Sequence, residues 1–170
     1  VRLWDAMTGQ ETLALKGHTN GVFGLAFSPD GKLLATAGGD GDARIWDAST
    51  GQLLMSLKGH RDQVFTVAFS LDGRRLVTSS EDSTAKVWDV ATGEELLTVR
   101  EESNKEGDNV LVWWATFSPD GLQIATAVAT DFAGGWTTIW DAETGQKRMT
   151  LPALGPSMRS VAFSPDGVHI

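Results

Sequence analysis

Short apolar runs separated by turn-forming residues recur along this chain. Residues 22–28 read VFGLAFS and lie between Gly17-His18 and the turn Pro29-Asp30-Gly31. The run is rich in strand formers and its apolar positions do not alternate with polar ones, which predicts a strand buried on both faces. Residues 32–37, 43–46 and 52–57 follow as further predicted strands, with glycine-containing turns at 39–41 and 47–51 between them. The pattern predicts four antiparallel strands and no helix.

Two short motifs repeat in step along the sequence. Trp-Asp stands at 4–5, 46–47, 88–89 and 140–141, and Ser-x-Asp-Gly stands at 28–31, 70–73, 118–121 and 164–167. Successive Trp positions are 42, 42 and 52 residues apart, and such a period indicates one structural unit copied several times. The third copy carries two insertions, of six residues before its first strand and four inside its second turn. Sheets with two apolar faces are expected to stack on one another around an axis.

The composition is typical of a globular domain, with 41% hydrophobic and 21% charged residues in a chain of 170. The chain has no cysteine and three histidines, so we expect neither a metal nor a cofactor. A net charge of −8 disfavours nucleic acid and anionic membranes as partners. The sequence contains no apolar run of the length that a membrane span needs and no visible signal peptide, so the expected location is cytoplasmic.

The two motifs, repeated four times in phase, resemble the WD-repeat (Trp-Asp repeat) β-propeller family over essentially the whole chain. Turns of the Asp-Ala-x-Thr-Gly kind, such as residues 47–51, resemble those of bacterial members. The resemblance implies an all-β fold, a β-propeller of four-stranded antiparallel sheets called blades. About four blades' worth of chain is present, which we expect to form an open arc or a fragment of a larger propeller. A closed four-bladed ring and an eight-bladed ring of two arcs are the alternatives.

The repeat positions divide the chain, taken as one propeller segment over 1–170, into a series of units. These are a half blade (1–16), two blades (17–57 and 58–99), a blade with insertions (100–151) and a second half blade (152–170). The last of them is expected to supply a first strand at 158–164 and part of a second at 168–170. An open arc exposes apolar faces and strand edges, which favours self-association.

The resemblance also implies a hydrogen-bonded tetrad of His, Thr, Asp and Trp in each regular copy. The matching sets are His18, Thr36, Asp40 and Trp46 in one copy, and His60, Thr78, Asp82 and Trp88 in the next. A carboxylate accepts from the imidazole, the other ring nitrogen meets the hydroxyl, and the hydroxyl accepts from the indole, so each buried polar group has a partner. The same residue types form nucleophilic triads, but a set that repeats every 42 residues favours the structural role.

The third copy departs from this pattern. Its His position falls in the polar, mostly acidic stretch 100–109, which we expect to be an exposed, mobile loop. Its second turn is lengthened to 129–135, and the family's turn Asp is displaced. We therefore expect this blade to be held by packing alone, with Trp113, Trp114 and Trp136 compensating through apolar area.

Two acidic stretches are weaker candidates for a cation site. Asp40-Gly41-Asp42 has a calcium-like spacing, but it lacks the later Glu of such loops, and a plain turn is favoured. The acidic cluster of the third copy could attract a divalent ion or a basic partner, and a solvated loop is the favoured interpretation. Its members are Glu101, Glu102, Glu106 and Asp108.

The leading functional hypothesis is a non-catalytic protein- or peptide-binding scaffold, a segment of a larger multi-domain protein. The resemblance places partners where the loops before the first strands meet the central channel. The matching positions are Phe23, Phe65, Trp113 and Arg159, flanked by Asn20, Arg61, Asp62 and Gln63. Aromatic residues and Arg are the types that interface hot spots favour, although the same residues could simply pack between blades. The alternatives are an enzyme on a propeller scaffold and a purely architectural, self-assembling arc.

Overall fold

The computed structural model describes residues 1–103, 105–131, 134–152 and 157–170. These residues form strands, turns and loops, with no helix among them, and so no helix of a length and hydrophobicity that could cross a membrane. The strands are β1 (Arg2–Trp4), β2 (Glu11–Ala14), β3 (Val22–Phe27), β4 (Leu33–Gly38), β5 (Ala43–Asp47), β6 (Leu53–Leu57), β7 (Val64–Phe69), β8 (Arg75–Ser80), β9 (Thr84–Asp89), β10 (Glu95–Arg100), β11 (Val110–Phe117), β12 (Gln123–Thr130), β13 (Trp136–Asp141) and β14 (Lys147–Pro152).

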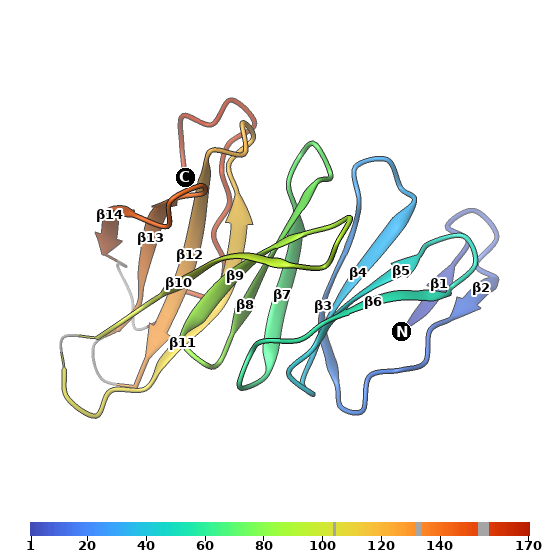
Figure 1. Ribbon diagram of the computed structural model, residues 1–170, viewed down its shortest axis with the longest axis horizontal. Coiled ribbons are helices and arrows are strands. Elements are labelled where there is room, and N and C mark those ends of the chain that lie inside the picture. Colours follow the sequence, from blue (N-terminus) through green and yellow to red (C-terminus); the bar gives the residue numbers. More distant parts are fainter. Residues whose placement is uncertain (104, 132–133, 153–156) are drawn as a thin grey trace.

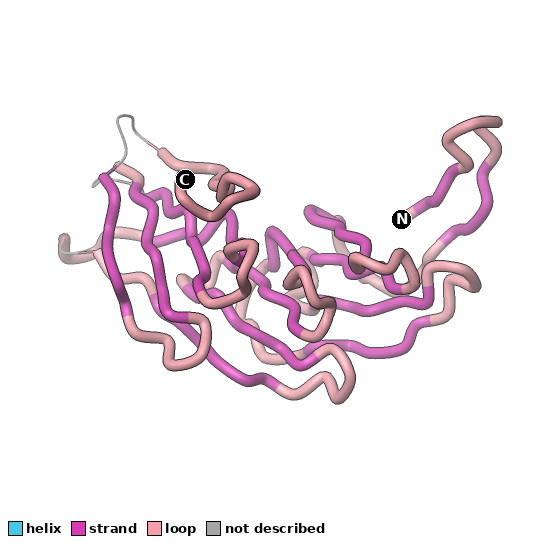
Figure 2. Tube along the Cα trace, turned by 90° about the horizontal axis from the view of Figure 1, so that it is seen from above, coloured by secondary structure: helices cyan, strands magenta, loops and turns pink. Residues whose placement is uncertain are grey.

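The strands form three four-stranded antiparallel sheets and one two-stranded sheet. The first blade is β3-β4-β5-β6, the second is β7-β8-β9-β10 and the third is β11-β12-β13-β14, while β1 and β2 form an N-terminal pair. Neighbouring strands follow one another in sequence because the connections are short turns. The sheets stand side by side in an open arc, with the two termini towards opposite ends (Figures 1 and 2). The predicted all-β arc of four-stranded blades is confirmed.

The hydrophobic core lies between the blades. Val67 of the second blade packs with Ala35, Ala37 and Ile45 of the first. Ala115 of the third blade joins a cluster from the middle strands of the second in the same way. Each sheet therefore removes apolar surface of its neighbour from water, which is the main source of stability for such a stack.

The first strand of the first blade differs from its prediction. It was expected to be buried on both faces, but Phe23, Leu25 and Phe27 are 54%, 58% and 52% exposed. The equivalent strand β7 lies between β3 and β11, and its Phe65 is only 8% exposed. The N-terminal pair has only two strands and packs on Leu34 of β4 and Trp46 of β5, which leaves this side of β3 uncovered among the described residues.

The C-terminal segment also differs from its prediction. The strands expected at 158–164 and 168–170 are not formed in the described residues 157–170, where the only strand-type pairing is an isolated bridge between Ser157 and Ala129. Val161 and Phe163 nevertheless pack against the third blade. A strand needs a hydrogen-bonding neighbour, and the edge of β1 that could provide one lies at the far end of the arc (Figure 1).

The insertion in the third copy lengthens a hairpin. The turn predicted at 129–135 is shorter than expected, because β12 continues to Thr130 and β13 begins at Trp136. Residues 132–133 of that turn lie outside the described residues. The added residues extend the ladder through pairs such as Ala129 with Leu111 and Val128 with Trp136, so their backbone groups are satisfied by strand pairing.

Candidate functional site

The four tetrad residues of the first blade are brought together across β4, β5 and the loops beside them. Nδ1 of His18 lies 2.8 Å from Oδ1 of Asp40, and Nε2 of His18 lies 2.8 Å from Oγ1 of Thr36. The Trp46 indole N–H donates to the same Oγ1 at 2.9 Å. Every polar group in this buried chain has a partner, so the set acts as an internal brace between strands.

The second blade repeats this arrangement. His60 lies 3.0 Å from Asp82 and 2.7 Å from Thr78, and the Trp88 indole donates to Thr78 at 2.9 Å. The Thr84 hydroxyl adds a further bond to Asp82. The His, Asp and Thr side chains are thus occupied by one another in both blades, and the hydroxyls accept from an indole instead of facing a substrate cavity.

The tetrad carboxylates are held in their ionised form. Burial opposes ionisation of Asp40, but the Thr19 amide, His18 and Arg44 outweigh it and lower the pKa of Asp40 to about 2. Burial likewise opposes ionisation of Asp82, and hydrogen bonds from His60, Thr84 and the Arg61 amide lower its pKa well below the usual range. Both groups therefore carry a negative charge at neutral pH.

The calcium-like spacing at Asp40-Gly41-Asp42 is part of this brace. Nη2 of Arg44 lies 3.2 Å from a carboxylate oxygen of Asp40 and 3.2 Å from one of Asp42. Arg44 is 8% exposed, so the two carboxylates share a buried cation supplied by the protein itself. Arg44 thus pairs with both carboxylates of this segment, which fits the plain turn favoured from the sequence.

The third blade is braced by Glu101, and the expectation that packing alone holds it is wrong. The Thr126 hydroxyl donates to Oε1 of Glu101 at 2.6 Å, and the Trp136 indole donates to Oε2 at 3.0 Å. The Trp140 indole donates to Thr126 at 2.9 Å, as in the other blades. Trp136 therefore acts as a hydrogen-bond donor, and a carboxylate takes the place of the imidazole.

Glu101 also overturns part of the prediction for the acidic loop. Glu101 is 2% exposed, whereas Glu102 and Glu106 are exposed. Glu101 follows directly after β10, and the loop begins beyond it. Its place at the end of a strand, ahead of the polar run, was the only available sign of an inward role. Among the described residues, no three His, Cys, Asp or Glu side chains lie close enough together to hold a metal ion.

Phe23, Phe65, Trp113 and Arg159 form a continuous contact series, here called the aromatic row. The rings of Phe23 and Phe65 meet edge to face with centroids 6.0 Å apart, and Phe65 stacks on Trp113 at 4.4 Å with 13° between planes. The Arg159 guanidinium lies 5.1 Å above the Trp113 ring. The row thus links the first strands of all three blades to the C-terminal segment.

The backbone explains why these aromatic side chains meet. In the first blade Val22 pairs with Gly38 and Gly24 with Ala37, which leaves Phe23 as the extra residue of a β-bulge. Phe65 and Trp113 are the extra residues at the equivalent irregularities of β7 and β11. A bulge re-aims its side chain out of the regular alternation of the strand, so the three rings turn towards one another.

The aromatic row is open at its ends and closed in the middle. Phe23 is 54% exposed and Arg159 is exposed, whereas Phe65 is 8% exposed and Trp113 is partly covered. Phe65 therefore packs between blades, the role that was the alternative for all of these residues. A partner that touches the row would reach Phe23, Arg159 and part of Trp113.

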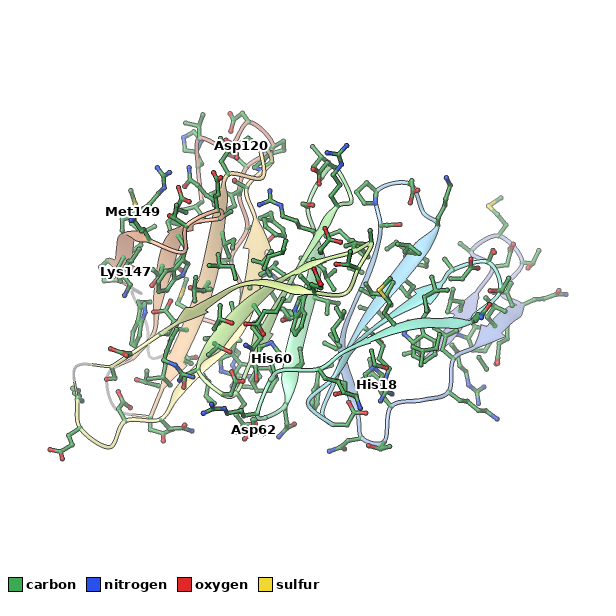
Figure 3. The ribbon with its side chains drawn as sticks, in the orientation of Figure 1. His18, His60, Asp62, Asp120, Lys147 and Met149 are labelled. Carbon is green, nitrogen blue, oxygen red and sulfur yellow. The ribbon has the colours of Figure 1, made fainter. Side chains whose placement is uncertain are left out.

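The flanking residues lie in the loops that precede β3 and β7. The Asn20 side chain donates to Gly39 O at 3.3 Å and the Asp62 carboxylate accepts from the Gln63 amide at 2.8 Å. The Gln63 side chain donates to Glu81 at 2.9 Å. Arg61 and Asp62 are exposed, and Asp62 lies along the lower edge in Figure 3, the edge from which the loops carrying His18 and His60 enter the blades.

Comparison with known proteins supports repeats of this class. The family model described as "WD domain, G-beta repeat" matches residues 9–47 and 51–89, so these two stretches are similar to WD40 repeats. Coronin-7 of Mus musculus is 57% identical over 44 residues, which is 26% of this chain and 5% of that protein. Nuclear distribution protein PAC1 of Mycosarcoma maydis is 56% identical over 34 residues, 20% of this chain and 8% of that protein. Ribosome assembly protein 4 of Chaetomium thermophilum is 50% identical over 34 residues, 20% of this chain and 7% of that protein.

These matches limit what can be transferred from the relatives. The matched stretch spans only 5% to 8% of the three relatives' lengths. All three are proteins of eukaryotes, so they give no support to the bacterial resemblance expected from the Asp-Ala-x-Thr-Gly turns. None of the three names is that of an enzyme.

Proposed function

We propose that this chain is a non-catalytic scaffold that binds a protein or peptide at the aromatic row. The observation that carries the proposal is the bulge shared by the three blades, which turns Phe23, Phe65 and Trp113 into one contact series ending in Arg159. Bulges that re-aim side chains occur preferentially at functional sites, and aromatic residues and Arg dominate binding energy at interfaces. Asn20, Arg61, Asp62 and Gln63 form the polar rim of this site.

A peptide selection experiment tests the proposal and does not require the natural partner. Peptides selected from a displayed library against the wild-type chain are measured by fluorescence anisotropy against Phe23→Ser and Arg159→Glu. Both side chains are exposed, so both variants should fold normally. We expect each to weaken the selected peptides by about tenfold or more, the size of a hot-spot loss. Leu54→Ser, an exposed change on β6, is the matched control.

Two results contradict the proposal. One is a set of selected peptides whose affinity is the same for the wild type, Phe23→Ser and Arg159→Glu. The other is a weakened affinity that Leu54→Ser reproduces, because the effect would then belong to any exposed apolar change and not to the row.

An architectural role is the second candidate, favoured by the uncovered face of β3. Phe23, Leu25 and Phe27 form an exposed apolar surface on the first strand of the first blade. Surfaces and edges of this kind pair with other chains. A mass measurement in solution tests it: association that Leu25→Glu abolishes would support it, and a strict monomer at high concentration would exclude it.

The remaining expectations stay predictions. Membership of a larger multi-domain protein, a cytoplasmic location and the lack of nucleic-acid or membrane partners rest on the sequence arguments. An enzyme on this scaffold has less support, because the His, Asp and Thr side chains of both tetrads are hydrogen-bonded to one another.

A further inference from the structure

A cavity lies at the opposite ends of the first strands from the aromatic row. Its volume is about 560 Å³, within the usual range for ligand sites. It is lined by the equivalent phenylalanines of four successive copies, Phe27, Phe69, Phe117 and Phe163. The Ser-x-Asp-Gly turns that bound it follow these phenylalanines along the upper edge of Figure 1, and Figure 3 places Asp120 at that edge and Asp62 at the other.

The cavity is accessible and is lined by uncharged side chains, and the Arg75 guanidinium lies 5.0 Å from the centre of the Phe117 ring. Besides the four rings the cavity wall contains only alanine, proline, leucine, serine and threonine side chains. Leu71 is 70% exposed and Phe27 is 52% exposed, so part of the apolar wall faces solvent. Apolar surface in a concave site of this size favours an apolar occupant, because burying it removes both surfaces from water.

The cavity continues outward between the turns. A groove of about 400 Å³ between the first two turns shares Pro29 and Leu71 with it, and a groove of about 250 Å³ between the next two shares Leu71 and Pro119. Together the three form one elongated surface that crosses three turns. Such a shape suits an extended segment better than a compact molecule.

The rim of this surface carries carboxylates. Asp30, Asp72 and Asp120 line the two grooves, each fixed by the hydroxyl of the serine two residues earlier. These hydroxyls lower the pKa of all three carboxyls, which keeps them ionised. The residue directly after the turn is Lys32 in the Asp30 turn and Arg74 in the Asp72 turn, whereas it is Leu122 in the Asp120 turn.

The two ends of the surface therefore differ in charge. Asp30 has an ion pair with Lys32 at 3.6 Å, and Asp72 is followed by Arg74. Arg75 reaches across to the next turn, where its Nη2 donates to the Gly121 carbonyl oxygen at 2.6 Å. The Asp120-Gly121 pair is followed by Leu122 and Gln123, and in the next turn the Asp166-Gly167 pair is followed by Val168. The groove beside Asp120 thus holds two carboxylates, Asp72 and Asp120, and one cation, Arg75. The remaining negative charge complements a cation attached to an apolar segment.

We propose that this turn-side surface binds an extended peptide segment whose aliphatic side chains enter the phenylalanine-lined cavity beside a Lys or Arg that pairs with Asp120. The site is independent of the aromatic row, since the two share no residue and lie at opposite ends of the first strands. Its failure would therefore leave the proposed function untouched.

Fluorescence anisotropy with synthetic probes tests this inference. The probe is a fluorescein-labelled peptide with two leucines flanked by lysines, and the control peptides carry serine for leucine or glutamate for lysine. We expect Leu71→Glu to weaken the probe by about tenfold or more, and Asp120→Asn to weaken it severalfold and reduce its salt dependence. Both changes are at turn residues, Leu71 is exposed, and asparagine keeps an acceptor for Ser118.

The controls separate this site from others. Leu54→Glu, an exposed change on the outer strand β6, should leave probe affinity unchanged, as should Phe23→Ser at the aromatic row. Equal affinity for all three peptides, insensitivity to Leu71→Glu, or no probe binding up to about 1 mM would each overturn the inference. Loss of probe binding in Phe23→Ser but not in Leu71→Glu would assign the probe to the aromatic row and overturn it as well.

Discussion

Glu101 and Thr126 are joined by a 2.6 Å hydrogen bond in which the hydroxyl donates to the carboxylate. In the first two blades the equivalent threonines, Thr36 and Thr78, contact a histidine. The third blade thus keeps the threonine and its tryptophan donor and receives a different acceptor from the end of β10. The hydrogen-bonded brace therefore involves the equivalent threonine in all three blades, with a carboxylate in place of an imidazole in the third.

Glu101→Ala should destabilise the chain by about 1–3 kcal/mol, because the Trp136 indole loses its acceptor and the buried Thr126 hydroxyl keeps only a 3.4 Å bond to Thr138 O. The free energy of unfolding from urea titration measures the loss. Glu102→Ala, at the exposed neighbouring position, is the control and should have little effect. If the two variants are equally stable, Glu101 is not a brace.

Thr36→Val should also cost about 1–3 kcal/mol, since valine has a similar shape but cannot accept from the Trp46 indole or meet His18. Thr36 is fully buried, so water cannot replace the lost partner. Thr12→Val, at an exposed position of β2, is the matched control. A Thr36→Val protein with the wild-type urea midpoint would show that the indole and imidazole find other partners.

Stability should fall in acid through the tetrad carboxylates. The pKa of Asp40 is lowered from 3.8 to about 2 in the folded state, so its contribution is complete above its ordinary pKa and is lost as the pH falls through the folded value. We expect the urea midpoint to decrease between about pH 4 and pH 2. Asp40→Asn isolates this contribution from that of the exposed aspartates.

The Asp40→Asn protein should be less stable than the wild type at neutral pH, and the difference should narrow as the pH approaches the folded-state pKa of about 2. A difference that stays constant from neutral pH to acid would mean that the charge of Asp40 contributes nothing and that only its shape matters.

Gly24→Ala should destabilise the contact between the first two blades. A Cβ at this position would lie 2.7 Å from the Phe65 carbonyl oxygen and 3.0 Å from Thr66 Cα, both backbone atoms that cannot move aside alone. The expected cost is about 1–3 kcal/mol, typical of overpacking. In Gly21→Ala the nearest atoms lie 3.8 Å away, so it is the matched control. Equal melting temperatures of the two variants would contradict the close approach.

Much of the fold follows from local pattern. The four strands of the first blade were predicted within one residue at each end, because apolar runs and Asp-Gly or Thr-Gly turns define them locally. The tetrad residues also stand at fixed offsets from the Trp-Asp motif, and the chain brings them together as the repeat implies. The period of 42 residues makes such positions predictable from one copy to the next.

The inward turn of Glu101 was not predictable in this way. In sequence it is one of several acids in a polar stretch, and composition alone assigns it to solvent. Its burial depends on Thr126 and Trp136, which are 25 and 35 residues away. The exposure of β3 is a similar case, because the strands β3 and β7 have nearly the same apolar pattern and differ only in how many neighbours stand beside them.

The amino-acid sequence by itself determined the repeating unit of this protein, the strands within each unit and the residue types of each tetrad, since all of these depend on spacing along the chain. Only the tertiary structure decided which copy of a strand is covered, which acid turns inward, and that Phe23, Phe65, Trp113 and Arg159 meet in one row. The physical reason is that burial and contact depend on the neighbouring sheet, and a repeated sequence does not specify where in the arc each copy stands.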